Sequence, residues 1–169
     1  MILLSVGQSN PFNRLVRTVD AWAILNNKNT IFGQIGAATY QPQNFEHIDF
    51  FASDTSRDAH YAKADLLICD LSKDVLLPAI EHELPVLALP RLSIFGEETG
   101  IDQCTLAQHL KSDDFITIAK DEQQLLELLS MPRMPFSKNI SKNYATSNNR
   151  AQRSARLQTS LADALREVS

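Results

Sequence analysis

The chain has 169 residues, of which 44% are hydrophobic and 21% are charged, with five Gly and seven Pro. This composition is typical of one globular domain and excludes disordered, fibrous and membrane-spanning chains. No apolar run approaches the roughly 20 residues of a membrane-spanning helix, and the first residues lack the basic leader of a signal peptide. We therefore expect a soluble, cytoplasmic protein.

The net charge of −4 hides an asymmetry between the two ends of the chain. Residues 1–129 hold nine Lys and Arg against eighteen Asp and Glu, which gives −9, whereas residues 130–169 hold seven against two, which gives +5. Nucleic-acid binding depends on clustered cations on the folded body. The acidic first part therefore argues against nucleic acid as a partner.

The two cysteines, Cys69 and Cys104, show no metal-binding spacing, and Cys69 ends an apolar run, which favours reduced thiols. The four histidines are scattered, with no Cys or carboxylate at ligand spacing. No nucleophile elbow is present either. We expect no metal site, no cofactor and no hydrolase triad.

Short apolar runs alternate with helix-period segments through residue 129, and this alternation is typical of an α/β fold. The predicted strands are residues 2–6, 30–35, 45–51, 65–69, 86–89 and 115–118. The first predicted helix begins near residue 10 and ends at residues 26–29. The second covers residues 53–63, and the third follows the fourth strand and ends near residue 82. The last two cover residues 102–111 and 121–129. Right-handed crossovers then give one largely parallel, doubly wound, Rossmann-like sheet, whose ligands bind at the carboxyl ends of the strands. The candidate site walls are the loops 7–13, 70–77 and 90–102.

The last 40 residues differ in amino-acid composition from the rest of the chain. Residues 130–149 are rich in Ser, Asn, Lys and Pro and predict an irregular connection, and a helical tail follows from residue 151. We divide the chain into a domain of residues 1–129 and a basic linker and docking helix of residues 130–169. The stripe of Leu157, Leu161 and Leu165 has no aromatic membrane anchor, so we expect it to dock on a partner subunit, a second copy or the acidic body.

A set of short segments lies in colinear order over residues 1–129: Ser5-Val6-Gly7, Pro11-Phe12-Asn13, Gln34-Ile35-Gly36, Asn44-Phe45-Glu46, Ala64-Asp65-Leu66, Leu89-Pro90-Arg91 and Asp102-Gln103. Together they resemble the C-terminal-type domain of glycosyltransferase family 28, in its small stand-alone form. In that family this domain is one half of a GT-B enzyme and binds the UDP-sugar donor, and a membrane-attached partner brings the lipid-linked acceptor. The resemblance implies the donor-binding subunit of a two-component hexosyltransferase, for lipid-linked saccharide or exopolysaccharide synthesis, which its partner would hold at the inner face of the membrane.

The chain departs from that family at the loop that holds the donor diphosphate. The family places a glycine-rich loop after the fourth strand, where this chain has Asp70-Leu71-Ser72-Lys73-Asp74-Val75. Two carboxylates there repel a phosphate, and Lys73 offsets part of that repulsion. The ribose-binding Glu of the family aligns with Pro78, which has no acceptor side chain. Because proline fits best in a first helical turn, we predict that residues 70–77 are not helical.

Eight residues remain candidates for donor binding, each with a structural alternative. Asp102 and Gln103 match a sugar-contacting pair of the family, and a helix cap explains Asp102 equally well. Arg91 suits a diphosphate at the pocket rim, with a surface salt bridge to Glu97 or Glu98 as the alternative. The remaining candidates line the first loop or the loop after the fourth strand: Gly7, Gln8, Asn13, Ser72 and Lys73.

Two functional hypotheses remain open. The first is an active donor-binding subunit. The second is a subunit that keeps the fold and the partner surface, has lost donor binding and serves a structural or regulatory role. The loop without glycine and Pro78 favour the second hypothesis.

Overall fold

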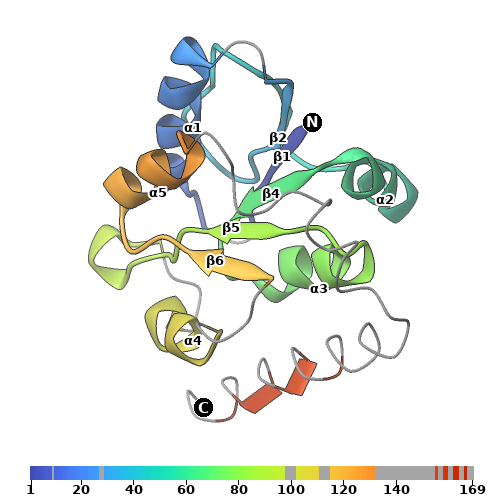
Figure 1. Ribbon diagram of the computed structural model, residues 1–169, viewed down its shortest axis with the longest axis vertical. Helices are drawn as coiled ribbons and strands as arrows, with labels where there is room; N and C mark the ends of the chain where they lie inside the picture. The colour runs from blue at the N-terminus through green and yellow to red at the C-terminus, as the bar shows by residue number, and fades with distance from the viewer. Residues whose placement is uncertain are drawn as a thin grey trace.

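The computed structural model describes residues 1–8, 10–26, 29–97, 102–110 and 115–131, together with single positions 155, 158, 159, 162, 163 and 166. Its described part contains one six-stranded sheet of parallel strands in the order β3-β2-β1-β4-β5-β6 (Figure 1). The predicted doubly wound α/β fold is therefore confirmed. Leu157, Leu161 and Leu165, the predicted docking stripe, lie outside the described residues.

The strands are β1 (Ile2–Ser5), β2 (Ile31–Gln34), β3 (Glu46–Ile48), β4 (Leu66–Cys69), β5 (Val86–Ala88) and β6 (Ile116–Ile118). The helices are α1 (Asn13–Leu25), α2 (Asp54–Lys63), α3 (Lys73–Glu81), α4 (Gln103–Leu110) and α5 (Glu122–Leu129), with a short 3-10 turn, η1 (Ser93–Phe95). Every predicted strand is present, and β3 is shorter than expected. Among the described helices, none is long and apolar enough to cross a membrane.

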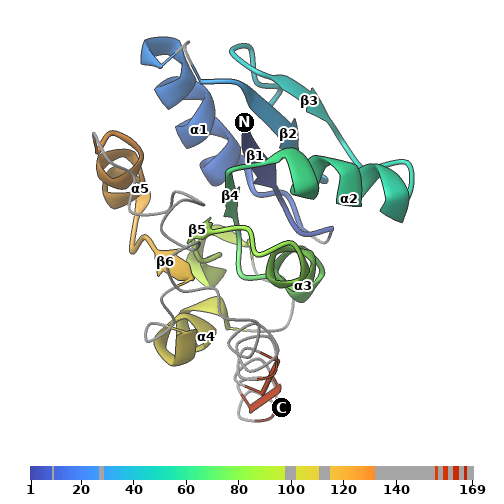
Figure 2. The same ribbon diagram turned by 45° about the vertical axis from the view of Figure 1, so that its right-hand side comes forward.

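Alternate residues of the central strands bury opposite faces of the sheet. Ile2, Leu4 and Ile68 pack in a core under α1 and α5, whereas Leu3 and Leu67 pack in a second core under α2, α3 and α4. Figures 1 and 2 show α1 beside α5 on one side of the sheet and α2 beside α3 on the other. Since both faces are covered, β1 and β4 are apolar with little alternation, except for Ser5 at the end of β1.

The prediction that residues 70–77 are not helical is wrong. Helix α3 begins at Lys73, and the N–H groups of Val75 and Leu76 both donate to the carbonyl of Ser72. Pro78 lies inside the helix and removes one backbone bond. The helix continues because Val75, Leu76 and Ala79 are buried against the sheet, and their burial outweighs that bond.

Candidate functional site

The loops that follow β1 and β4 meet at the carboxyl edge of the sheet. Neighbouring helices leave opposite faces of the sheet at this point, because α1 follows β1 on one face and α3 follows β4 on the other. Open α/β sheets bind their ligands in the crevice at such a switch in strand order. The candidate site therefore consists of residues of these two loops and of the loop after β5.

Asp70 and Arg91 form a buried ion pair in this crevice. The Arg91 Nε donates to Asp70 Oδ2, and the two side chains are 1% and 0% exposed. Arg91 was expected at the pocket rim or in a surface salt bridge with Glu97 or Glu98. The rim position and the Glu97 bridge are wrong, because Arg91 is buried and paired with Asp70, and Glu98 lies outside the described residues. The Glu97 carboxylate pairs with Arg14 instead, at 2.8 Å. Arg91 is held inside because its guanidinium also donates to the carbonyl of Glu97 and lies over the ring of Phe12.

Asp70 also takes two further donors from the crevice. The Gly7 N–H lies 3.2 Å from Asp70 Oδ1, and the Ser72 hydroxyl donates to Asp70 Oδ2 at 2.6 Å. The contact is tight, because a Cβ on Gly7 would lie 2.3 Å from Ser72 Oγ. The next amide, of Gln8, faces the Asp74 carboxylate at 3.4 Å. Two successive amides of the first loop thus point at carboxylates of the same chain.

Gln103 closes the network from α4. Its side-chain oxygen accepts the backbone N–H groups of Leu71 and Arg91, both at 3.0 Å, and it is 4% exposed. Asp102 has the contacts of a helix cap: it accepts the N–H of Cys104 and the hydroxyl of Thr105. The Thr105 hydrogen bond holds the pKa of Asp102 below its ordinary value. Whether Asp102 or Gln103 also contacts a sugar stays a prediction.

Four of the eight candidates are thus brought together in one network: Gly7, Ser72, Arg91 and Gln103. Their polar groups are directed at one another. Gln8 and Lys73 lie on the exposed border of the same region. Asn13 lies in α1 and binds a different segment, because its side-chain oxygen accepts the N–H groups of Thr39 and Tyr40.

A polar pocket of about 130 Å³ opens beside this network. It lies at the ends of β1 and β2 and at the first turns of α2 and α3, and its wall includes Ser5, Gln8, Gln34, Arg57, Tyr61 and Asp74. Its volume is below the roughly 300–1,000 Å³ of clefts that hold drug-sized ligands. Arg57, the cation among its lining residues, is already paired with Asp54 and Asp58.

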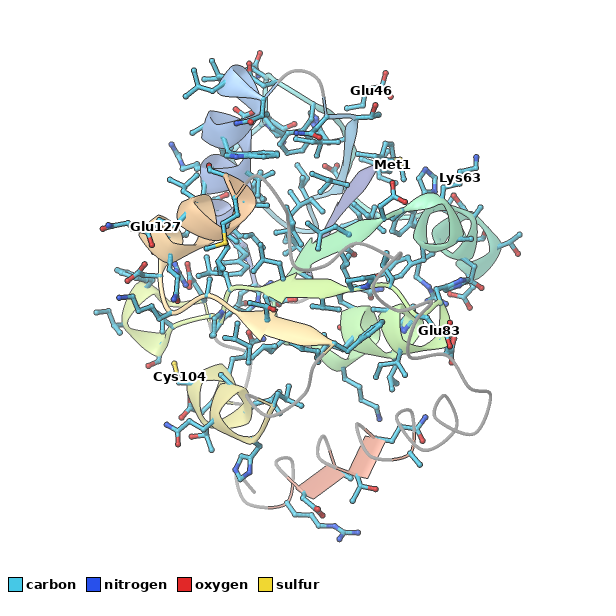
Figure 3. The ribbon with its side chains drawn as sticks, viewed as in Figure 1. Met1, Glu46, Lys63, Glu83, Cys104 and Glu127 are labelled. Carbon is cyan, nitrogen blue, oxygen red and sulfur yellow. The ribbon has the colours of Figure 1, made fainter. Side chains whose placement is uncertain are left out.

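Within the described ranges, no three His, Cys, Asp or Glu side chains converge as metal ligands. The thiol of Cys69 is buried, which raises its pKa, and Cys104 is exposed on α4 (Figure 3). Neither cysteine belongs to the crevice network.

Sequence reasoning missed the buried carboxylate that fixes the connection between β2 and β3. Asp20, in α1, accepts the Tyr40 hydroxyl at 2.6 Å and the N–H groups of Gln43 and Asn44. Burial by itself raises the pKa of Asp20, but the hydrogen bond from Tyr40 and those from Asn44 and Gln43 outweigh it, so the pKa lies below its ordinary value. The charged form is therefore favoured in the folded chain.

The Asp20→Asn variant tests this anchor. A depressed carboxyl pKa adds stability above the unfolded-state pKa of about 3.9, and this stability is lost as the pH falls through the folded-state pKa. We expect the variant to lose about 1.5–3 kcal/mol of unfolding free energy at pH 7. The difference from wild type, measured by urea denaturation, should shrink below pH 4. A difference that stays constant down to pH 2 would contradict this role of the charge.

Comparison with known proteins bears on the fold. The structure is similar to that of CalG4, the calicheamicin glycosyltransferase, with a TM-score of 0.53 and 13% identity over 96% of this chain and 39% of that one. The C-terminal CMP-Kdo binding domain of WaaA from Acinetobacter baumannii gives 0.47 and 11% identity, over 95% of this chain and 89% of that one. The glycosyltransferase of kitacinnamycin gives a TM-score of 0.49 and 12% identity, over 98% of this chain and 42% of that one.

No family model and no curated protein matches the chain. The chain spans about two fifths of the length of CalG4. Together with the sheet order, the similarity to CalG4 shows that the chain has the fold of one half of a GT-B glycosyltransferase.

Proposed function

We propose that this chain is a GT-B-type subunit that does not bind a sugar donor and acts as the partner-binding or regulatory half of a two-component hexosyltransferase. The partner is a membrane-attached, acceptor-binding subunit of lipid-linked saccharide or exopolysaccharide synthesis, or a second copy of this chain. The proposal rests on one observation above all. The buried Asp70 carboxylate accepts the Gly7 amide and pairs with Arg91, and it belongs to the segment that, by the resemblance, replaces the glycine-rich diphosphate loop of family 28.

Charge supports this proposal. A diphosphate placed at the crevice would meet Asp70 and Asp74, and like charges about 4 Å apart repel by about 4 kcal/mol at an effective dielectric of 20. Of the two cations that could offset this repulsion, Arg91 is already neutralised by Asp70, and Lys73 lies on the exposed border, where solvent screens its charge. Pro78 offers no acceptor for a ribose hydroxyl, although α3 runs through its position.

The second candidate function is the donor-binding half of an active hexosyltransferase. The polar pocket beside the crevice favours it, because the pocket opens at the carboxyl ends of β1 and β2. In this case UDP-sugar would bind from the pocket toward α3, and the Asp70 loop would have to rearrange.

Calorimetric titration of the full chain with uridine, UDP and UDP-N-acetylglucosamine separates the two candidates. We expect dissociation constants above about 1 mM, equivalent to less than about 4 kcal/mol of binding free energy. We also expect UDP to bind no more tightly than uridine, because the diphosphate gains no free donor. Micromolar binding of UDP, with a clear gain over uridine, would reject the proposal and support the donor-binding enzyme.

A further inference from the structure

We propose that the crevice between the β1 and β4 loops is a complete anion-binding site whose anion is the chain's own Asp70 carboxylate. The inference deepens the proposed function and rests on it, since a crevice filled in this way leaves no place for a donor phosphate. The ligand that the site selects is a small planar carboxylate, and the side chain that blocks the site is Asp70.

Three donors converge on the Asp70 carboxylate from three segments. The Gly7 amide donates to one oxygen, and the Ser72 hydroxyl and Arg91 Nε donate to the other. An amide, a hydroxyl and a guanidinium are the donors that proteins use to bind external carboxylates and phosphates. The next amide, of Gln8, faces a second carboxylate, that of Asp74, and adds no donor to Asp70.

Arg91 is also held by contacts that do not involve Asp70. Its Nη1 donates to the carbonyls of Asn10, at 2.7 Å, and Glu97, at 3.0 Å, and its Nη2 donates to the carbonyl of Gly7 at 3.4 Å. The Phe12 ring lies 4.7 Å from the guanidinium carbon. These contacts orient the cation from sides other than the one that Asp70 occupies. Removing the carboxylate thus leaves a preorganised cation with its Nε unpaired.

The space that Asp70 fills has the size of one carboxylate. Gly7 and Ser72 lie in close contact beside it, since a Cβ on Gly7 would lie 2.3 Å from Ser72 Oγ and 3.1 Å from Asp70 Oδ2, which favours a small anion over a larger one. The site is therefore expected to prefer formate or acetate over tetrahedral phosphate. In the wild-type chain an external anion enters only when Asp70 leaves, so the carboxylate acts as an internal competitor of any anionic ligand at the switch in strand order.

The test asks whether an added anion stabilises the Asp70→Ala variant. Its thermal unfolding is measured in formate, acetate or phosphate, at an ionic strength held constant with chloride. We expect formate to raise the melting temperature of the variant by about 3–6 °C at ten times its dissociation constant. Acetate should act less, and phosphate least. Wild type should not respond, and neither should Asp74→Ala, whose carboxylate is exposed and lies 3.4 Å from its amide partner.

The double variant Asp70→Ala/Arg91→Met is the matched control, because it lacks the cation and should lose the response to formate. If Asp70→Ala does not fold in chloride, folding that appears with formate in circular dichroism supports the proposal, and failure to fold in either salt overturns it. Equal responses of wild type and Asp70→Ala, or none in a folded variant, also overturn it. Tight UDP binding by wild type would reject the proposed function, whatever the response of the variant to formate.

Discussion

Replacement of Asp70 by alanine is expected to lower the free energy of unfolding by about 3–5 kcal/mol in chloride buffer, measured by urea denaturation. The substitution leaves the Arg91 guanidinium, which is 1% exposed, without its counter-charge in a low-dielectric environment. It also leaves the Gly7 N–H and the Ser72 hydroxyl without their acceptor. Each of these groups was desolvated on folding, and the loss of one partner leaves that cost uncompensated.

Two variants separate charge burial from general damage. Asp74→Ala removes an exposed carboxylate from the same segment and should cost less than about 1 kcal/mol. Asp70→Leu/Arg91→Met replaces both charges with apolar side chains and should recover most of the stability lost by Asp70→Ala. If the double variant were no more stable than Asp70→Ala, the loss would come from packing or from the Gly7 N–H and Ser72 hydroxyl that lack an acceptor in both variants, and not from an unpaired cation.

The second large effect is expected from Phe12→Ala. Phe12 is fully buried at the N-terminus of α1, and truncation of a buried phenylalanine lowers the free energy of unfolding by about 3–5 kcal/mol. Its ring also lies against two cations, with the guanidinium carbons of Arg91 and Arg14 at 4.7 and 5.2 Å. The variant loses these cation–π contacts as well as core volume. Denaturant unfolding with an unchanged m-value would measure the loss.

Phe95→Ala provides the comparison within the same part of the structure. Phe95 also lies over Arg14, at 5.4 Å, but is 58% exposed in η1. We expect its truncation to change stability by no more than about 0.5 kcal/mol. Similar losses at Phe12 and Phe95 would mean that the contact with Arg14, and not burial, dominates at both positions.

The elements of the fold were predictable because each strand or helix carries a recognisable pattern of apolar residues. Leu66–Cys69 is a short apolar run buried on both faces, and such runs indicate strands of a parallel sheet. In α1, Leu15, Val19 and Trp22 recur at helical spacing and are buried as expected. The strand ends were less well predicted, as β3 shows, because the polar residues around Glu46 and Asp49 do not mark where pairing stops.

Much less of the candidate site was predictable. The sequence placed Gly7, Ser72, Arg91 and Gln103 at one edge of the sheet, and they do meet there. It gave no sign that Arg91 would pair with Asp70 rather than with Glu97, because the choice depends on how three loops pack. For Pro78 the local preference pointed to a helix start, and tertiary burial overrode it.

The hydrogen bonds of Arg91 limit how far the lengths of two loop segments, residues 7–10 and 91–97, can vary. Its guanidinium donates to carbonyls of Gly7, Asn10 and Glu97, and its own N–H is held by Gln103. Loops at the edge of a sheet ordinarily accept insertions and deletions without loss of the fold. Here one residue added to or removed from the segment 7–10 or 91–97 moves a carbonyl away from a buried cation. These two segments therefore have the length constraints of core elements, although they are loops.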